Sequence, residues 1–485
     1  MFRPLCAGFS GLAAFSLAVA PTPPAAAEEP LLRLVAATGN VVAERYPGDP
    51  GVALDLGLHL AARERFELRV RRPSYGRAPE VHRWAGGRYE RLPDGLVKDF
   101  SGLPGFLEVK VIDKRGRTVA RLAQKFCPAG VAHRVQRDAA PVSPYPESCP
   151  THPFTLGTVW GVQRGWALPF TPVGENLVDL KPGKYRLEAS VARKYRRLLD
   201  VSGEVRTIGL TVRAAADQEH GGGHTGRRLA LAARDGAQRP GRRPSTVPPV
   251  PQGPKPDLRA LPAWDITVSH TNDTGRVVKK RDYLRFSTTV WNAGPSRLVV
   301  DGFRREGSDV MDAYQYFYDA DGTQTGHTRT GTFEWEPKSG HEHWHFRDFA
   351  AYRLLSADGE RVVRGRKEAF CLANTDQIDL TVEGANPRPE NTDLSSSCGQ
   401  STSVSLRQAL EAGSGDTYEH SLPGQSFDVT KIPNGVYRLE VTANPARRLV
   451  ETDLDNNVAL RRITLGGRPG ARTVEVERVG MIKGH

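Results

Sequence analysis

The sequence predicts an all-β protein made of two β-sandwich domains joined by a linker rich in proline and glycine. The chain has 485 residues, which is enough for two or three domains. Apolar residues occur in short runs of strand length, separated by many of the 49 glycines and 36 prolines. One segment, 215–256, has a triple glycine at 221–223 and a proline-rich run at 247–251. Such a composition cannot pack a core, and we expect a mobile linker that is extended where proline dominates.

The first predicted domain, residues 30–214, contains five runs with the composition of strands. They are Leu31–Ala36, Phe66–Val70, Phe106–Ile112, Tyr185–Ala192 and Val205–Val212. Turn residues such as Pro182 and Gly183 lie between them, as in an antiparallel sandwich.

The second predicted domain, residues 257–468, returns to the same pattern. Its clearest strand-like runs are Tyr283–Trp291, Ala350–Leu355, Val436–Thr442 and Ala459–Leu465. The remaining residues, 469–485, are predicted to form a tail that frays at its end.

The N-terminus has the features of a secretory signal peptide. Arg3 gives a positive start, Leu5–Ala20 is an apolar run, and the three alanines at 25–27 offer a cleavage site. The apolar run is too short for a membrane-spanning helix and ends in prolines, and no second long apolar run follows. We therefore expect residues 1–27 to be removed and the protein to be secreted, with no transmembrane helix.

Four cysteines follow the predicted signal: Cys127, Cys149, Cys371 and Cys398. An even number in an exported chain favours two disulfides, for which three pairings are possible. Zinc binding by these cysteines is less favoured because no Cys-x-x-Cys occurs.

An internal repeat selects one of the three pairings. Residues 180–191 resemble residues 432–443, and the pair Phe126-Cys127 matches Phe370-Cys371. Each Phe-Cys pair is followed some two dozen positions later by another cysteine, which favours disulfides within each half, Cys127–Cys149 and Cys371–Cys398. We expect residues 30–214 to be a degenerate repeat of the second domain. Alignment on the repeated tyrosines sets Trp166 opposite Tyr418.

The net charge of +12 comes from 67 basic and 55 acidic residues. A basic exported protein has anionic cell-wall polymers among its possible partners, although the excess can equally be a solvated surface. The sequence shows no basic-aromatic nucleic-acid module, so we expect no nucleic-acid partner.

The strongest chemical signal is the run of alternating histidines at His341, His343 and His345. In a strand, alternate side chains point to the same face, so the three imidazoles share one side. Neutral imidazoles suit copper, zinc, iron or nickel. Convergence on one ion requires a bend or strong twist, because the outer two positions of a straight strand lie about 13 Å apart. The plainer interpretation is a histidine-rich patch on a solvated strand.

Three further motifs follow in the same domain. Lys367 lies in Gly-Arg-Lys-Glu-Ala-Phe-Cys-Leu, and Tyr418 lies in Gly-Asp-Thr-Tyr. An acidic stretch near the end contains oxygen ligands that suit calcium. These ligands are Glu451, Asp453, Asn456 and Asn457. Alone, each motif has a structural explanation, such as a surface lysine, a strand tyrosine or a turn capped by Asn and Asp.

Together and in this order, the motifs resemble the catalytic domain of lysyl oxidases over residues 257–468. The resemblance implies that the second sandwich is lysyl-oxidase-like and that His341, His343 and His345 bind copper. It also implies that Lys367 and Tyr418 become cross-linked as the cofactor lysyl tyrosylquinone. The family's calcium pattern matches the acidic stretch, and it adds Asp257 and Leu258 as early partners of the ion.

The resemblance further implies an exported amine oxidase. Such an enzyme converts primary amines, including lysine side chains of proteins, to aldehydes with molecular oxygen, and releases ammonia and hydrogen peroxide. Asp416 and His420 lie nearest Tyr418 in sequence and are the candidates for the general base, although either can be a turn residue. The basic net charge disfavours a strongly basic protein substrate.

Two other functions remain open from the sequence. The first is a non-catalytic, calcium-stabilised cell-wall or adhesion module with a structural metal at the histidines. The second is a zinc hydrolase, which has no evident partner carboxylate because Glu342 points to the other face of the strand.

Overall fold

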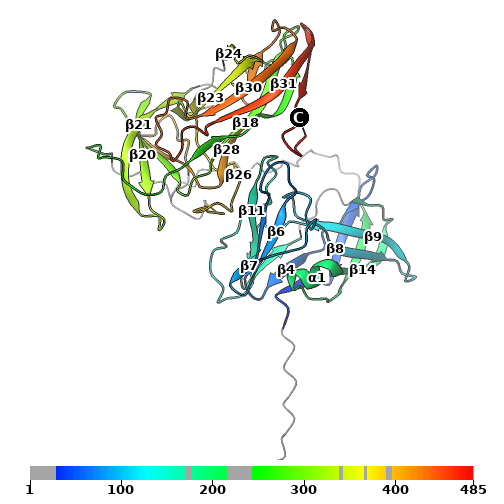
Figure 1. Cartoon of the computed structure of the whole chain (residues 1–485). Helices are drawn as coiled ribbons and strands as arrows, with labels where there is room; N and C mark the ends of the chain where they lie inside the picture. The colour runs from blue at the N-terminus through cyan, green and yellow to red at the C-terminus, as the bar shows by residue number, and fades with distance from the viewer. Residues whose placement is uncertain are drawn as a thin grey trace, which may run out of the picture.

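The computed structural model describes residues 29–170, 177–215, 243–272, 274–337, 342–364, 369–388 and 396–483. The predicted signal peptide at 1–27, most of the predicted linker, His341 and Lys367 lie outside these residues. The described residues form thirty-two strands and one helix, α1 (Arg193–Leu199), which confirms the all-β prediction (Figure 1). No helix among them is long and apolar enough to cross a membrane.

Fifteen strands belong to the first half of the chain, residues 29–215. They are β1 (Leu32–Ala36), β2 (Asn40–Arg45), β3 (Val52–Ala53), β4 (Leu58–Ala62), β5 (Phe66–Arg71), β6 (Glu80–Ala85), β7 (Arg88–Arg91), β8 (Leu103–Ile112), β9 (Thr118–Phe126), β10 (His133–Arg134), β11 (Gly157–Val162), β12 (Trp166–Pro169), β13 (Leu177–Val178), β14 (Gly183–Val191) and β15 (Arg206–Ala214). Their large sheets have the orders β1-β4-β12-β10, β11-β5-β6-β7 and β2-β15-β14-β8-β9.

The other strands belong to the second half, residues 243–483. They are β16 (Leu258–Ala260), β17 (Trp264–Ser269), β18 (Tyr283–Asn292), β19 (Leu298–Arg304), β20 (Val310–Tyr318), β21 (Gln324–Glu336), β22 (His343–Arg347), β23 (Ala350–Ser356), β24 (Arg361–Arg364), β25 (Ala369–Phe370), β26 (Asp376–Gln377), β27 (Ser405–Leu410), β28 (Ser414–Tyr418), β29 (Ser426–Asp428), β30 (Gly435–Ala443), β31 (Val458–Arg468) and β32 (Ala471–Val476). Their sheets have the orders β16-β18-β28-β26, β25-β22-β21-β20-β19-β27 and β24-β23-β30-β31-β32.

Alternation of apolar and polar residues explains why these segments form strands. In β14, Leu187, Ala189 and Val191 are buried while the residues between them are partly exposed. A strand with period two buries one face and leaves the other in water. Each half has its own large cluster of buried apolar side chains, one drawn from residues 32–212 and the other from residues 258–465.

Parts of the predicted linker and tail make contacts with the second half. Residues 243–256 pack on the second half: Arg243 pairs with Asp312 at 2.7 Å, and Lys255 lies over the Phe317 ring at 5.1 Å. Residues 469–476 extend the last sheet, because β32 pairs with β31. Charge pairing and strand pairing therefore order segments whose composition predicts mobility.

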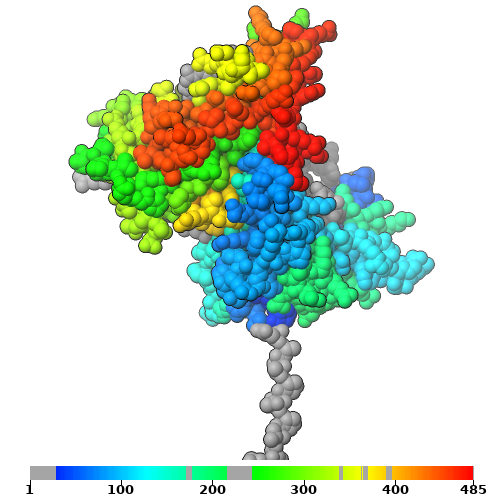
Figure 2. Space-filling view, in the orientation of Figure 1, coloured from blue at the N-terminus to red at the C-terminus, as the bar shows by residue number. Residues whose placement is uncertain are grey.

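The two halves are in contact. Phe154 of the first half is buried with Leu261, Trp291 and Ile378 of the second half. The C-terminal residues take part as well, because the Met481 N–H donates to the Tyr75 carbonyl at 2.8 Å. Figure 2 shows these red C-terminal residues against the blue first half.

Candidate active site

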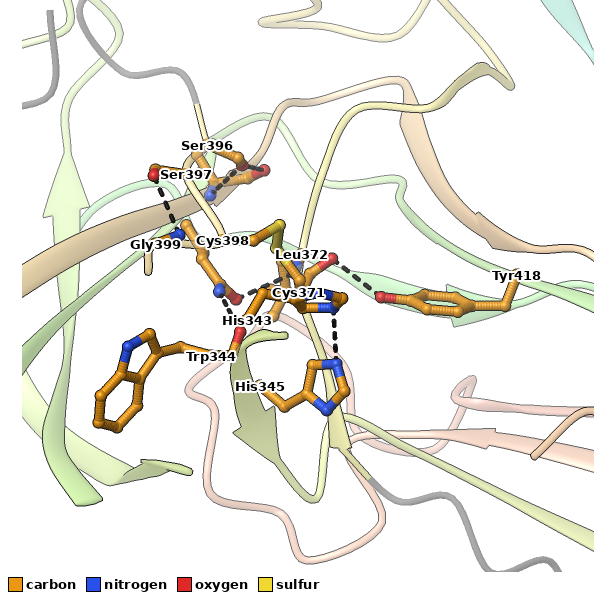
Figure 3. The surroundings of a disulfide bond; sticks show 12 residues. His343, Trp344, His345, Cys371, Leu372, Ser396, Ser397, Cys398, Gly399 and Tyr418 are labelled. Carbon is orange, nitrogen blue, oxygen red and sulfur yellow. Dashed lines mark hydrogen bonds between the residues drawn. A yellow bond between two sulfur atoms is a disulfide. The ribbon is translucent and has the colours of Figure 1, made fainter. Parts of the chain in front are cut away.

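Strand β22 presents two of the three predicted metal-binding histidines on one face. The Nε2 atoms of His343 and His345 lie 2.8 Å apart, and the ring centroids are separated by 4.5 Å (Figure 3). Two imidazole nitrogens at about 2.05 Å from one metal ion, at right angles, lie about 2.9 Å apart. In this structure the 2.8 Å contact is a hydrogen bond between the two rings, and its length is close to the spacing of two nitrogen ligands on one ion.

The strand is held in place by Trp344, which lies between the two histidines and points to the opposite face. Its side chain is fully buried, and its Nε1–H donates to the Gln400 carbonyl at 2.8 Å. Its backbone N–H donates to the Cys398 carbonyl at 2.8 Å. Burial and these hydrogen bonds fix the side of the strand on which the imidazoles stand.

Tyr418 ends strand β28 inside the same region. Its hydroxyl donates to the Cys371 carbonyl at 2.9 Å, and its ring meets the edge of the Phe370 ring at a centroid distance of 4.6 Å. Burial raises the pKa of Tyr418 well above its ordinary value, and the nearby Asp416 carboxylate raises it further. The phenol is therefore protonated at neutral pH, and a nearby cation would be needed to favour the tyrosinate.

The disulfide Cys371–Cys398 joins the tyrosine side of the site to the histidine side. The structure confirms the pairing predicted from the repeat in both halves, Cys127–Cys149 and Cys371–Cys398. The Cys371 carbonyl accepts a hydrogen bond from the Tyr418 hydroxyl, and the Cys398 carbonyl accepts one from the backbone N–H of Trp344 in the histidine strand. Figure 3 shows the bridge between these two contacts.

A buried glutamine, not predicted from the sequence, makes a second link. Gln408 accepts the Leu372 N–H at 3.0 Å and donates to the Trp344 carbonyl at 3.0 Å. It is fully buried in β27. Its residue type alone carries no signal, since only the fold brings both backbone groups to its amide.

The two candidates for the general base have different surroundings. Asp416 is buried, with 2% of its surface exposed, and lies on the Tyr418 side of β28 because alternate strand residues share a face. His420 is half-buried, and its Nδ1 lies 2.6 Å from an Asp265 carboxylate oxygen. A carboxylate in this position orients the imidazole.

The predicted calcium ligands converge from the beginning and the end of the second half. The Glu451 carboxylate accepts the Leu258 N–H at 2.7 Å and the Asn457 amide at 2.8 Å. The Asn456 amide donates to both oxygens of Asp257, at 3.0 and 3.2 Å. Residues separated by almost two hundred positions thus form one oxygen-rich cluster.

The chemistry of this cluster fits a hard cation. The Oδ1 atoms of Asn456 and Asn457 are buried without a hydrogen-bond partner. If either side-chain amide rotated by half a turn, its oxygen would point towards the Asp257 and Glu451 carboxylates and join them as an oxygen ligand. Burial also raises the pKa of Glu451, the direction expected for a carboxylate removed from water. Asp453 lies at the edge, 3.2 Å from the Asn456 amide.

Within the described ranges, no group of three or more His, Cys, Asp or Glu side chains has a geometry that could hold a metal ion. Both candidate sites draw on further ligands. His341 lies outside the described residues, as does Lys367, and the acidic cluster depends on asparagine oxygens. The metal and cofactor assignments therefore remain predictions.

The fold and the site place the second half in a class of all-β domains with paired histidines near a buried, disulfide-anchored tyrosine. The family model for lysyl oxidase matches residues 314–474, which include both histidines and the tyrosine. The likeness to the lysyl oxidase family therefore rests on this region of the second half.

Individual relatives match over the same part of the chain. It is 32% identical over 130 residues to lysyl oxidase homolog 3B of Danio rerio, covering 27% of this chain and 14% of that protein. It is 35% identical over 136 residues to lysyl oxidase homolog 1 of Homo sapiens, covering 28% and 21%. The aligned part thus spans only 14% and 21% of the length of these two relatives. The first half of this chain lies outside the family model.

Proposed function

We propose that this protein is an exported, copper-dependent amine oxidase that uses a cofactor formed from Lys367 and Tyr418. The observation that carries the proposal is the pairing of two features in one disulfide-linked unit. Two imidazole nitrogens converge to 2.8 Å, and a buried phenol is held against Cys371. The match of residues 314–474 to the lysyl oxidase family model supports an amine oxidase in general.

The residues of the chain have separate roles in this proposal. His343 and His345, with His341, hold copper, and the Trp344 contacts keep their strand in register. The Phe370 ring and the Cys371 carbonyl fix the plane and the hydroxyl of Tyr418. Such fixed placement lowers the entropic cost of bringing reacting groups together.

When bound, copper and the mature quinone would supply the oxidation of a primary amine by dioxygen: with one water consumed, the amine gives an aldehyde and ammonia, and dioxygen is reduced to hydrogen peroxide. Removal of a proton from the substrate carbon needs a base from the chain. We assign this role to His420 or Asp416, and we favour His420 because Asp265 orients it and it is partly exposed to solvent.

The remaining parts of the proposal concern context. Calcium is bound by six residues that connect the start of the second half to its end: Asp257, Leu258, Glu451, Asp453, Asn456 and Asn457. Residues 1–27 direct export, and residues 30–214 and 257–468 are two domains joined through 215–256. Primary amines, including protein lysine side chains, are the substrates. Anionic cell-wall polymers are a partner class that the net charge of +12 supports.

A peroxide assay tests the proposal. The full chain, matured with copper in air, is expected to release hydrogen peroxide from primary amines. Tyr418→Phe is expected to abolish turnover while it retains copper. Amine-dependent peroxide release by Tyr418→Phe equal to that of the wild type would overturn the proposal.

A further inference from the structure

The two halves of the chain have matching strand orders in their large sheets. In the first half the orders are β1-β4-β12-β10, β11-β5-β6-β7 and β15-β14-β8-β9. In the second half β16-β18-β28-β26, β27-β19-β20-β21 and β31-β30-β23-β24 repeat them. The matched strands also follow each other in the same order along the chain. The halves differ in two places. In the second half β22 and β25 extend the sheet beyond β21, whereas the first-half sheet ends at β7. At another edge β2 joins β15 in parallel but β32 joins β31 antiparallel.

Side-chain contacts repeat along with the strands. Tyr185 and Tyr437 hold the same place, and each hydroxyl donates at 2.8 Å to the carbonyl four residues earlier. A cross-strand ion pair is present in both halves, as Lys110–Glu188 and Arg353–Glu440. The Ala192 N–H donates to the Phe106 carbonyl as the Asn444 N–H donates to the Phe349 carbonyl. These contacts fix the alignment of the two halves to the residue.

The register of the sheets identifies the first-half counterpart of Tyr418. The two-residue edge strands pair as His133–Ala167 and Arg134–Trp166 in one half, and as Asp376–Gly415 and Gln377–Ser414 in the other. Trp166 therefore corresponds to Ser414, and Phe170, four residues further on, corresponds to Tyr418. The alignment on tyrosines that sets Trp166 opposite Tyr418 is wrong, because four more residues separate β28 from Tyr437 than separate β12 from Tyr185.

Ring contacts agree with this assignment. The Phe170 and Phe126 rings lie 4.5 Å apart, and the Tyr418 and Phe370 rings lie 4.6 Å apart. Phe126 and Phe370 each precede a cysteine of the corresponding disulfide. Because phenylalanine has no hydroxyl, the first half lacks the phenol from which a quinone is made.

The first-half positions that correspond to the metal-binding histidines carry other residues. The pairs Leu103–Phe126 and Phe346–Phe370 set the register here. Gly102 then corresponds to His345, and Phe100 corresponds to His343. A Cβ atom at Gly102 would lie 2.4 Å from the Phe126 carbonyl oxygen, so this position admits no imidazole.

The first half joins the sheet that carries Tyr418. The Leu156 N–H donates to the Ile378 carbonyl at 2.6 Å, and the Leu380 N–H donates to the Gly157 carbonyl at 3.0 Å. Since β26 pairs with β28, residues 156–157 add a strand segment at the edge of that sheet. Added strands of this kind bind through the main chain.

The buried His152 of the first half is linked by hydrogen bonds to the face of β28 opposite Tyr418. The His152 Nδ1 accepts the Phe154 N–H at 3.1 Å, so its Nε2–H donates to the Thr289 hydroxyl at 2.9 Å. The Thr289 hydroxyl in turn bonds the Thr417 hydroxyl at 2.8 Å. Thr417 and Tyr418 point to opposite faces of β28, so this chain of hydrogen bonds supports the strand from behind.

We propose that the first half is a second copy of the catalytic fold without cofactor residues, and that it positions the Tyr418 strand through His152 and the added strand segment. The positioning role rests on the proposed amine oxidase function, whereas the correspondence of the halves does not. His152 is a positioning residue, because it reaches Tyr418 only through Thr289 and Thr417.

Substitution of His152 in the full chain tests the positioning role. His152→Ala is expected to lower quinone absorbance per chain, after a fixed time of maturation with copper, about tenfold, the effect of losing about 1.4 kcal/mol. Bound copper is expected to stay unchanged. His152→Gln, whose amide can donate to Thr289, is expected to restore most of the yield. Tyr195→Phe is the matched control, since it removes a buried hydrogen bond to Pro104 in the same half, away from the interface.

Two outcomes would overturn the positioning role: normal quinone yield in His152→Ala, or an equal loss in Tyr195→Phe. Hydrogen exchange separates this result from failure of the proposed function. His152→Ala is expected to speed amide exchange at Leu156 and Leu380 even if the wild type forms no quinone, and unchanged exchange there would also refute the role. A crystal structure tests the correspondence of the halves: on superposition Phe170 is expected to fall on Tyr418, and any other residue at that position would refute it.

Discussion

The acidic cluster allows the sharpest quantitative prediction, through Glu451→Gln. The Glu451 carboxylate accepts hydrogen bonds from Asn444 at 2.6 Å, Asn457 at 2.8 Å and the Leu258 N–H at 2.7 Å. A glutamine can keep the bond from Leu258, but its NH₂ group then faces the two asparagine NH₂ groups. Two hydrogen bonds to a charged acceptor are lost, at about 1.5 kcal/mol each.

Relief of an unfavourable buried charge offsets part of that loss. Burial raises the pKa of Glu451, so the neutral glutamine avoids some desolvation, and we expect a net loss of about 2 kcal/mol. For a domain of about 200 residues this lowers the Tm by about 4–8 °C. Calcium at a hundredfold excess over its Kd raises the free energy of unfolding of the wild type by about 2.7 kcal/mol, which corresponds to a rise in Tm of about 5–10 °C. It is expected to change the stability of the variant hardly at all.

Scanning calorimetry with EGTA and then with added calcium measures both effects. Glu477→Gln is the matched control, because its carboxylate is exposed and lies 3.5 Å from Arg462, so its loss is expected to change stability by less than about 0.5 kcal/mol. If calcium raised the Tm of Glu451→Gln as much as that of the wild type, the assignment of these residues to calcium would be refuted.

Further predictions concern the site and the interface. Tyr418→Phe is expected to lose quinone absorbance but only about 1 kcal/mol of stability, since one hydrogen bond to Cys371 is removed; unfolding of the variant would contradict this. His343→Ala is expected to lose copper on dialysis, measured by metal analysis, and full retention would contradict the metal role. Replacing Cys371 and Cys398 by serine opens a crosslink that spans 27 positions and is expected to cost about 3–4 kcal/mol in denaturant unfolding; an unchanged midpoint would refute the estimate. Burial lowers the pKa of His152 from 6.5 to about 4, so the unfolded chain takes up a proton first as the pH falls. Stability is therefore complete above about pH 6.5 and falls by up to about 3 kcal/mol towards pH 4; His152→Gln is expected to lack this fall, and an identical pH profile in the variant would contradict the assignment.

Local patterns in the sequence predict much of the fold. Runs such as Tyr283–Trp291 and Val436–Thr442 alternate or carry β-formers, and the structure has strands there, at Tyr283–Asn292 and Gly435–Ala443. The disulfides follow from the repeated Phe-Cys pairs. The ordering of residues 243–256 and 469–476 could not be predicted, because it depends on partners distant in sequence, such as Asp312 for Arg243.

The candidate site was predictable to the extent that its residues lie in motifs. His343, His345 and Tyr418 belong to such motifs, whereas Gln408 and His152 do not. Gln408 acts through two backbone groups from different segments, and His152 acts across the contact between the halves. Contacts of this kind depend on tertiary structure, to which a single sequence without an alignment gives no guide.

The measurement that tests the central claim most directly is peptide mapping by mass spectrometry, with visible absorption, on the full chain matured with copper in air. We expect one cross-linked peptide that joins Lys367 to Tyr418, and a quinone absorbance that shifts when phenylhydrazine is added. Unmodified Lys367 and Tyr418 in fully copper-loaded protein would contradict it and would favour a non-catalytic, calcium-stabilised module.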